Sequence, residues 1–219
     1  MNREEIRRHY SENRPEIDSR LEEFRGLREA LDERLFKELC FVIFTSQSSA
    51  EDAWSATEKL DEKGLLLDPE KEAIESILVN HGIQYEARKA EFLEDNLCFL
   101  SQPTFSDPSS SIKLRSRIKP DNLEKCREWL VDNVKGLSWK GASHFLRNIG
   151  YGNSFAILSS HTVSVLFDLD VLKSSEPPKN RSQYLDAERK VQEFSEEIGI
   201  DIQALDLVLW SYRTGKVFK

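Results

Sequence analysis

The sequence predicts an all-α fold. Apolar residues recur at helical spacing along most of the 219 residues, and no internal repeat is visible. Residues 101–120 differ, because they contain three prolines, a run of serines and few spaced apolar residues, which is typical of a loop. The length suits one domain or two closely packed subdomains. We therefore expect two helical lobes around a cleft, formed by 1–30 with 121–219 and by 31–100, and joined by a linker over 101–120.

The first element expected is a helix that begins near Pro15, since Leu21, Phe24 and Leu27 lie three residues apart. The dense apolar run over 35–44 fits either a buried central helix or a strand. Its neighbours are helical, which favours the helix.

The remaining elements follow the same spacing. Ser49 can cap a helix whose apolar face includes Leu60. Another helix begins at Ser160 and is ended before Pro177 and Pro178. Further helices are expected over 69–80, 85–100, 121–134, 183–198 and 202–212.

Composition excludes several classes of protein. Hydrophobic residues make up 39% and charged residues 32%, which is enough for a core and too charged for a membrane protein. Cys40, Cys98 and Cys126 are odd in number and far apart, which argues against a disulfide framework, a zinc ribbon or an iron–sulfur loop. We expect a cytoplasmic protein with no metal site and no cofactor.

The charge is unevenly distributed. The chain has a net charge of −8, but residues 112–151 carry 9 basic and 4 acidic side chains, a local net of +5. An acidic protein can present a basic face to nucleic acid in this way. From charge alone, a solvated helix face is the simpler interpretation. The basic residues of this stretch are Lys113, Arg115, Arg117, Lys119, Lys125, Arg127, Lys135, Lys140 and Arg147.

Residues 134–147 are the most informative segment, because they predict a helix, a short hairpin and a second helix. The hairpin contains Gly136 and Ser138 and follows Lys135. Unpaired amides at a helix N-terminus can bind a phosphate without reading base sequence. An ordinary helix–helix connection also favours glycine, and on the hairpin alone that interpretation prevails.

Lys140 lies in the first turn of the second helix. The helix dipole and nearby Lys135 should lower the pKa of its ammonium. A partly neutral amine beside bound nucleic acid can form a Schiff base with a sugar C1′. A lysine at this position could instead pair with a phosphate or remain solvated.

Four stretches of the sequence are similar to motifs of the archaeal-type 8-oxoguanine DNA glycosylase/AP lyases, a compact branch of the helix–hairpin–helix glycosylase superfamily. They are FKELCF at 36–41, RKAE at 88–91, the segment 140–151 and the ending 206–219. The last two are long and specific, and the resemblance covers nearly the whole chain. It implies a base-excision repair enzyme that acts as a monomer on double-stranded DNA with a damaged purine, in the cytoplasm of a prokaryote.

The resemblance also implies residue roles. Lys140 falls on the catalytic lysine, which would attack C1′, release the base and hold the sugar as an imine until β-elimination nicks the strand. Trp210 falls on an aromatic that binds the extruded base, and Tyr85 on one near the lesion or its partner base. The terminal carboxylate of Lys219 falls on the group that recognises the lesion, and an anion suits the N7–H donor of 8-oxoguanine. Contacts to DNA are expected from Lys135, Gly136, Ser138, Arg147, Lys113 and Arg115.

Two positions depart from the family pattern. Ser138 stands where the hairpin normally has a second glycine, although a serine can still cap the helix. Ser159 stands where the family has a catalytic aspartate, in an Ile-x-Asp-x-His segment whose His161 is retained. A hydroxyl cannot stabilise a sugar cation or manage the lysine's proton as a carboxylate would. His161 could transfer protons or simply orient its helix.

Several interpretations of Ser159 stay open. Ser159 could position a water or Lys140 in an altered but active glycosylase. Another carboxylate could substitute, although Asp168 and Asp170 lie far along the presumed helix. The chain could also be a weak enzyme or a non-catalytic protein that binds lesions, or the serine could be an introduced residue.

Overall fold

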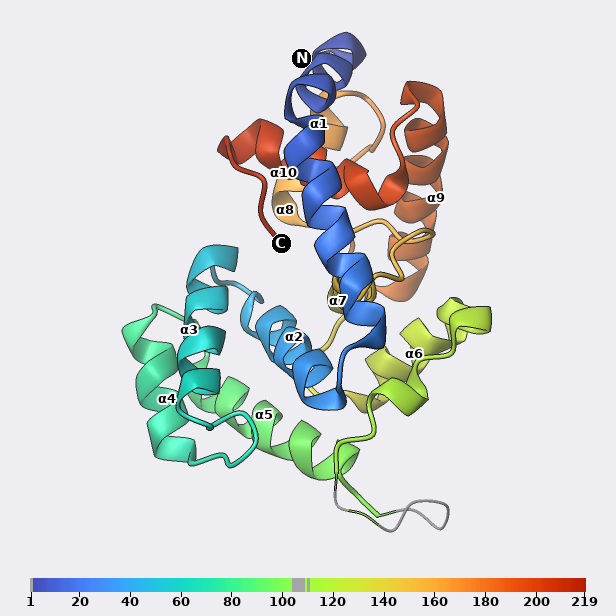
Figure 1. Ribbon diagram of the computed structural model, residues 1–219. Coiled ribbons are helices and arrows are strands. Elements are labelled where there is room, and N and C mark those ends of the chain that lie inside the picture. The colour runs from blue at the N-terminus through green and yellow to red at the C-terminus, as the bar shows by residue number, and fades with distance from the viewer. Residues whose placement is uncertain (1, 104–108, 110) are drawn as a thin grey trace. The chain divides into compact units, whose positions relative to one another are not determined.

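The computed structural model describes residues 2–103, 109 and 111–219, and within these residues the regular structure consists of helices alone (Figure 1). The all-α prediction is therefore confirmed. The helices are grouped into two compact units. Unit 1 contains residues 2–28 and Trp139–Lys219, and unit 2 contains Glu29–Ser138.

Unit 1 is assembled from both ends of the chain. Its first helix, α1, begins at Arg3, although the sequence suggested a start near Pro15. The reason is a capping box, in which the Asn2 side chain accepts from the Glu5 amide and the Glu5 side chain accepts from the Asn2 amide. Pro15 therefore lies inside the helix. The helices of unit 1 are α1 (Arg3–Gly26), α7 (Trp139–Asn148), α8 (Ser160–Asp168), α9 (Arg181–Ile198) and α10 (Ile202–Thr214).

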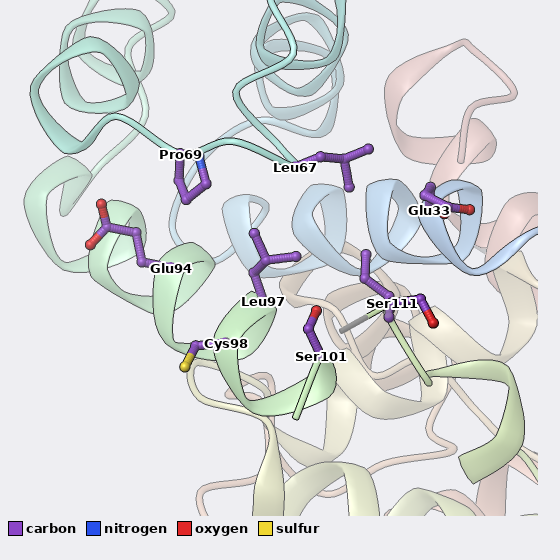
Figure 2. A pocket seen from close by; sticks show the side chains of 9 residues that line it. Glu33, Leu67, Pro69, Glu94, Leu97, Cys98, Ser101 and Ser111 are labelled. Carbon is purple, nitrogen blue, oxygen red and sulfur yellow. The ribbon is translucent and has the colours of Figure 1, made fainter. Parts of the chain in front are cut away.

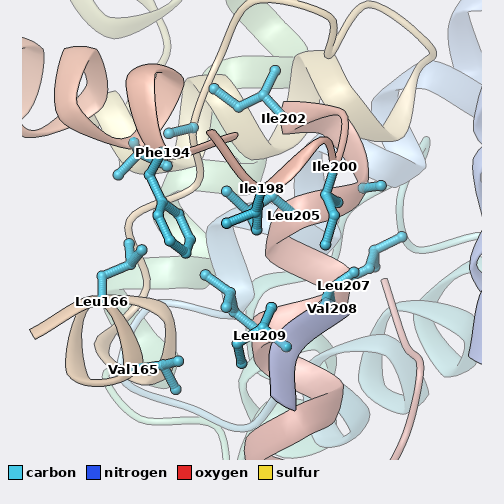
Figure 3. Close-up of a cluster of buried hydrophobic side chains, with 14 of the residues drawn as sticks. Val165, Leu166, Phe194, Ile198, Ile200, Ile202, Leu205, Leu207, Val208 and Leu209 are labelled. Atoms are coloured by element: carbon cyan, nitrogen blue, oxygen red, sulfur yellow. The ribbon is translucent and has the colours of Figure 1, made fainter. Parts of the chain in front are cut away.

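A single apolar cluster holds these helices together. Phe194 of α9 lies beside Leu166 of α8 and Leu209 of α10 (Figure 3). From α1, Leu21 and Phe24 join the same cluster, and α1 packs along α10. Burial of each such side chain contributes about 1.5–3 kcal/mol relative to exposure. The cluster fixes α8 and α10, and Trp139 at the start of α7 packs against it, so it positions the helices that carry most of the candidate site.

Unit 2 is formed by one continuous stretch of chain. The apolar run that fitted either a helix or a strand is a helix, and all of its residues from Leu39 to Phe44 are buried. The elements of unit 2 are α2 (Asp32–Phe44), α3 (Ala50–Glu62), α4 (Lys71–Asn80), α5 (Glu86–Leu100), α6 (Leu123–Asn133) and the short 3-10 turns η2 (Arg115–Arg117) and η3 (Pro120–Asn122); η1 (Leu27–Glu29) lies at the unit boundary.

Residues 121–138 group with unit 2, whereas the sequence pattern placed them with the C-terminal lobe. Two contacts to α5 explain this. The Asn96 side chain accepts from the Lys135 amide at 2.8 Å and donates to the Lys135 carbonyl at 3.0 Å. The rings of Phe99 and Trp129 stack with centroids 6.1 Å apart. Of the expected linker 101–120, residues 104–108 and 110 lie outside the described residues.

A pocket of about 430 Å³ in unit 2 opens between α5 and the loop after α3 (Figure 2). Its described lining includes the carboxylates of Glu33 and Glu94 and the exposed thiol of Cys98. None of the functional residues expected from the sequence lines it, and its acidic rim is unsuited to phosphate. In the described part of the chain, no helix is both long and apolar enough to cross a membrane.

Candidate active site

Helix α7 supplies three basic side chains to the interior of unit 1. Lys140, His144 and Arg147 are spaced four and three residues apart, so they follow one face of the helix. Residues from Gly141 to Asn148 are buried on every side, and Lys140 is half-buried at the start of the helix. A buried basic face of this kind requires acidic or carbonyl partners from neighbouring elements.

The pKa of Lys140 is lowered, in the direction expected from the sequence but mainly for another reason. Burial is the largest cause, since it disfavours the ammonium, and the negative charge of Asp206 opposes the shift. The ammonium of Lys135 instead pairs with Asp95 at 2.7 Å within unit 2. Lys140 is therefore easier to deprotonate than an exposed lysine.

Asp206 is the carboxylate that faces this basic cluster. It is 9% exposed, its Oδ1 accepts from the Thr162 hydroxyl at 2.8 Å, and its Oδ2 lies 3.5 Å from an Arg147 nitrogen. Burial raises the pKa of Asp206, and Arg147, the Thr162 hydrogen bond, Lys140 and His161 act in the opposite direction. The Arg147 guanidinium also stacks over the Phe24 ring at 4.7 Å.

Ser159 is the N-cap residue of α8. Its Oγ accepts from the Thr162 amide at 3.1 Å and lies 2.8 Å from the Thr162 hydroxyl oxygen. Because that hydroxyl donates to Asp206, the two hydroxyls connect position 159 to the buried carboxylate. His161, one residue into α8, is exposed.

His144 links the lysine helix to the end of the chain. It hydrogen-bonds to the backbone of Lys219, and Lys140 and Arg147 lie close enough for their charges to act on it. Burial is the largest of the causes that hold the pKa of His144 well below its ordinary value. The imidazole therefore stays neutral at physiological pH and serves as a fixed hydrogen-bonding group.

Trp210 lies one helical turn after Asp206 on α10, so the two side chains share a face. Its ring is half-buried, with the ring of Phe218 at a centroid distance of 6.1 Å. Four of the residues expected from the sequence, Lys140, Ser159, Trp210 and Lys219, belong to unit 1.

In unit 2, the hairpin glycine and Tyr85 line the same pocket of about 440 Å³, together with Gln47, Arg88 and Phe92. Tyr85 is 59% exposed and adopts a left-handed backbone with φ 59°. Its hydroxyl donates to the side chain of Gln47, itself at φ 55°, over 3.3 Å. A tyrosine held in this strained conformation is available at the surface of unit 2.

Two of the expected DNA contacts need correction. Arg147 is 2% exposed and paired with Asp206 inside unit 1. Lys113 is 8% exposed, and its ammonium donates to the carbonyls of Gln102, Ser109 and Ser111. Neither cation is presented to a phosphate, because Arg147 pairs with a buried carboxylate and Lys113 donates to backbone carbonyls.

The other expected DNA contacts are compatible with a surface role. Arg115, Lys135, Gly136 and Ser138 are exposed. Arg115 pairs with Glu29, and Lys135 pairs with Asp95. Exposed pairs of this kind contribute little to stability, so either cation can exchange its partner for a phosphate.

Asp206, Thr162 and His144 were not expected from the sequence. Asp206 carried a signal, since it is a lone carboxylate within the apolar run ALDLVL and a buried charge needs partners. His144 is offset from Lys140 by one helical turn, which also places it on the lysine's face. Thr162 has no comparable signal. Asp168 and Asp170, considered as substitutes for the missing carboxylate, line a different pocket with Arg3 and Glu197.

Comparison with known proteins agrees with this architecture. Residues 17–200 match the family described as 8-oxoguanine DNA glycosylase. An 8-oxoguanine DNA glycosylase/AP lyase of Korarchaeum cryptofilum is 37% identical over 93% of this chain and 90% of its own. The crystal structure of the 8-oxoguanine DNA glycosylase of Thermotoga maritima has a TM-score of 0.84 and 32% identity, covering 99% of this chain and 98% of that one.

The Methanocaldococcus jannaschii 8-oxoguanine glycosylase/lyase, solved in complex with a 15mer DNA containing 8-oxoguanine, has a TM-score of 0.80 and 30% identity over 98% of this chain and 99% of that one. These likenesses extend over both units and both ends of the chain. The fold and the lysine-bearing hairpin helix define a helix–hairpin–helix DNA glycosylase. The chain belongs to the 8-oxoguanine DNA glycosylase family.

Proposed function

We propose that this protein is a DNA glycosylase that removes 8-oxoguanine from double-stranded DNA and then nicks the abasic strand by β-elimination. Family membership supports the reaction class, because relatives that span nearly the whole chain are named 8-oxoguanine DNA glycosylase/AP lyase. The DNA complex of the Methanocaldococcus jannaschii protein supports DNA as the partner. We further propose that the protein acts as a monomer on DNA in the cytoplasm.

The observation that carries this proposal is the environment of Lys140. Its pKa is lowered by burial, so the neutral amine forms more readily than at an exposed lysine. Such an amine can attack C1′, displace the base and form an imine with the opened sugar. The unit also supplies an aromatic ring, Trp210, for the extruded base.

The other residues expected from the sequence are assigned to lesion recognition and to contacts with the DNA backbone. His144 holds Lys219 at the lysine helix, where Lys219 reads the lesion. Tyr85 acts at the lesion or its partner base, and the backbone around Gly136 binds a phosphate. Lys135, Ser138 and Arg115 provide further contacts to the DNA backbone, which position the protein without specifying sequence.

A second function is a lesion-binding protein that releases bases slowly or not at all. Ser159 favours it, because a hydroxyl occupies the position of the family's acidic residue. Lys140 favours the enzyme, since binding a lesion does not require an amine whose pKa is lowered by burial, whereas Trp210 and the ending 206–219 suit both functions.

Borohydride trapping on duplex DNA that contains 8-oxoguanine tests the proposal. The wild type should form a covalent protein–DNA adduct and nick the strand, and Lys140→Gln should do neither while still binding DNA. Lys173→Gln, which replaces an exposed lysine of unit 1, is the matched control and should behave as the wild type. Adduct formation by Lys140→Gln would refute the assignment, and no adduct or base release by the wild type would favour the binding protein.

A further inference from the structure

Position 159 performs a structural task, and its serine supplies no charge for acid–base chemistry. Ser159 Oγ accepts from the Thr162 amide and so satisfies the first turn of α8. The same oxygen lies 2.8 Å from the Thr162 hydroxyl. A serine here can pass on a hydrogen bond, but it brings no charge.

The charge lies at the other end of that hydrogen-bond chain. The Thr162 hydroxyl donates to Asp206 Oδ1 at 2.8 Å, and the carboxylate is 9% exposed. Arg147 on α7 pairs with it, and Lys140 on α7 and His161 on α8 lie near enough for their charges to act on it. One turn further along α10 lies Trp210, the ring proposed to bind the base. A carboxylate is thus built into the lysine site from a different helix.

We propose that Asp206 is the acid–base partner of Lys140, and that it replaces the acidic residue missing at position 159 through the Thr162 and Ser159 hydroxyls. This inference rests on the proposed function, because it assigns a group to that reaction. The carboxylate that substitutes is therefore Asp206 of α10, and not Asp168 or Asp170.

Each proton in the reaction can then be assigned. The neutral Lys140 amine attacks C1′, and a C–N bond forms as the C1′–N9 bond breaks. The electron pair of that bond leaves with the base, which takes a proton from water. The attacking nitrogen now carries two protons and a positive charge, and one proton passes through the Ser159 and Thr162 hydroxyls to Asp206. When the C1′–O4′ bond breaks to form the imine, Asp206 returns this proton to O4′. Its negative charge also stabilises the positive charge that develops at C1′ and O4′ during attack.

The shifts of both groups suit this exchange. Burial lowers the pKa of Lys140 and raises the pKa of Asp206, so the lysine releases its proton more readily, and the carboxylate accepts one more readily, than the same groups in water. A rival explanation is that Asp206 only neutralises Arg147, whose nitrogen lies 3.5 Å away. The two explanations differ in what they expect for a substrate that has already lost its base.

Asp206→Asn separates them when two substrates are compared. With 8-oxoguanine duplex, base release under single turnover should fall about a hundredfold, the usual loss when one group that stabilises transition-state charge is removed. With a pre-formed abasic site no base must leave, and Lys140 loses the charge that raised its pKa, so borohydride trapping should stay within a few-fold of the wild type. Ser159→Asp in the Asp206→Asn background should recover at least about tenfold of the lost base release.

Each outcome points to one explanation. Loss of both activities in a folded Asp206→Asn protein, or unchanged base release, would overturn the inference and leave Asp206 as a partner of Arg147. A wild type inactive on both substrates would instead overturn the proposed function. Folding of each variant is checked by its melting temperature.

If Asp206→Asn does not fold, Thr162→Val gives a second test that keeps the Asp206–Arg147 pair. It removes a hydrogen bond that lowers the pKa of Asp206. The acidic limb of the rate profile should therefore move to higher pH, and base release should slow about tenfold. Thr57→Val, which removes another buried hydroxyl bonded to Ala53 in unit 2, should change neither. Identical pH profiles for wild type and Thr162→Val would refute the role of Asp206.

Discussion

Replacing Gly136 by alanine should destabilise unit 2 more than any conformational preference explains. Gly136 has φ +82°, and a Cβ built there would lie 2.5 Å from Phe92 Cδ2 and 3.2 Å from Ile43 Cγ2. A non-glycine residue in the left-handed region costs about 1–2 kcal/mol. Overpacking against a ring that is already in contact adds about 1–3 kcal/mol. The free energy of unfolding should therefore fall by about 2–5 kcal/mol.

Gly64→Ala is the matched control, since Gly64 has φ +74° with no atom within 4 Å of the added Cβ. It should show the conformational cost of about 1–2 kcal/mol alone. Denaturant unfolding followed by far-UV circular dichroism measures both variants against the wild type. Equal losses for the two variants would show that the Phe92 ring moves away freely, and that the hairpin is not held by packing on α5.

Two further perturbations test buried groups. The pKa of His144 is lowered on folding, so at mildly acidic pH the unfolded state binds a proton that the folded state does not. The free energy of unfolding should therefore rise with pH by up to about 1.4 kcal/mol per pH unit between the folded-state pKa and the unfolded-state pKa near 6.5. His144→Phe should remove this part of the slope, and parallel pH curves for the two proteins would contradict the assignment. Lys113→Met should lower stability by about 1.5–3 kcal/mol, as it removes charged hydrogen bonds to loop carbonyls, without changing the salt dependence of DNA binding. Lys119→Met, at an exposed position, should leave stability nearly unchanged but reduce the slope of log K against log salt concentration by about one. Filter-binding titrations at several salt concentrations measure this slope. A reduced slope for Lys113→Met and an unchanged slope for Lys119→Met would restore Lys113 to the DNA interface.

The helices could be predicted because burial imposes their period on the sequence. The run over 35–44 and the helix over 202–212 were both expected, and they occur as α2 and α10. The start of α1 was missed because Pro15 is a strong local signal for a helix start, whereas the Asn2–Glu5 capping box depends on only two side chains.

The environments of individual charges could not be predicted in the same way. Arg147 and Lys113 are basic residues of the kind that bind DNA, but both are buried. Their burial depends on tertiary contacts that cannot be read from the sequence. The partner of Arg147 is Asp206, 59 residues further along the chain. The motifs singled out Lys140 within a basic segment, whereas the carboxylate whose charge acts on it, Asp206, comes from another helix and becomes visible only when α7, α8 and α10 are packed.

The division of the chain has a consequence for the order in which the protein folds. Unit 2 is one continuous stretch of residues, but unit 1 requires α1 from the beginning of the chain and α10 from its end. During synthesis, unit 2 can fold as soon as Ser138 has left the ribosome, whereas the partner surface of α1 does not yet exist. The first helix must wait with Leu21 and Phe24 uncovered until the last helix is made. Closing so long a loop is slow, and an incomplete chain exposes apolar surface that a chaperone can recognise.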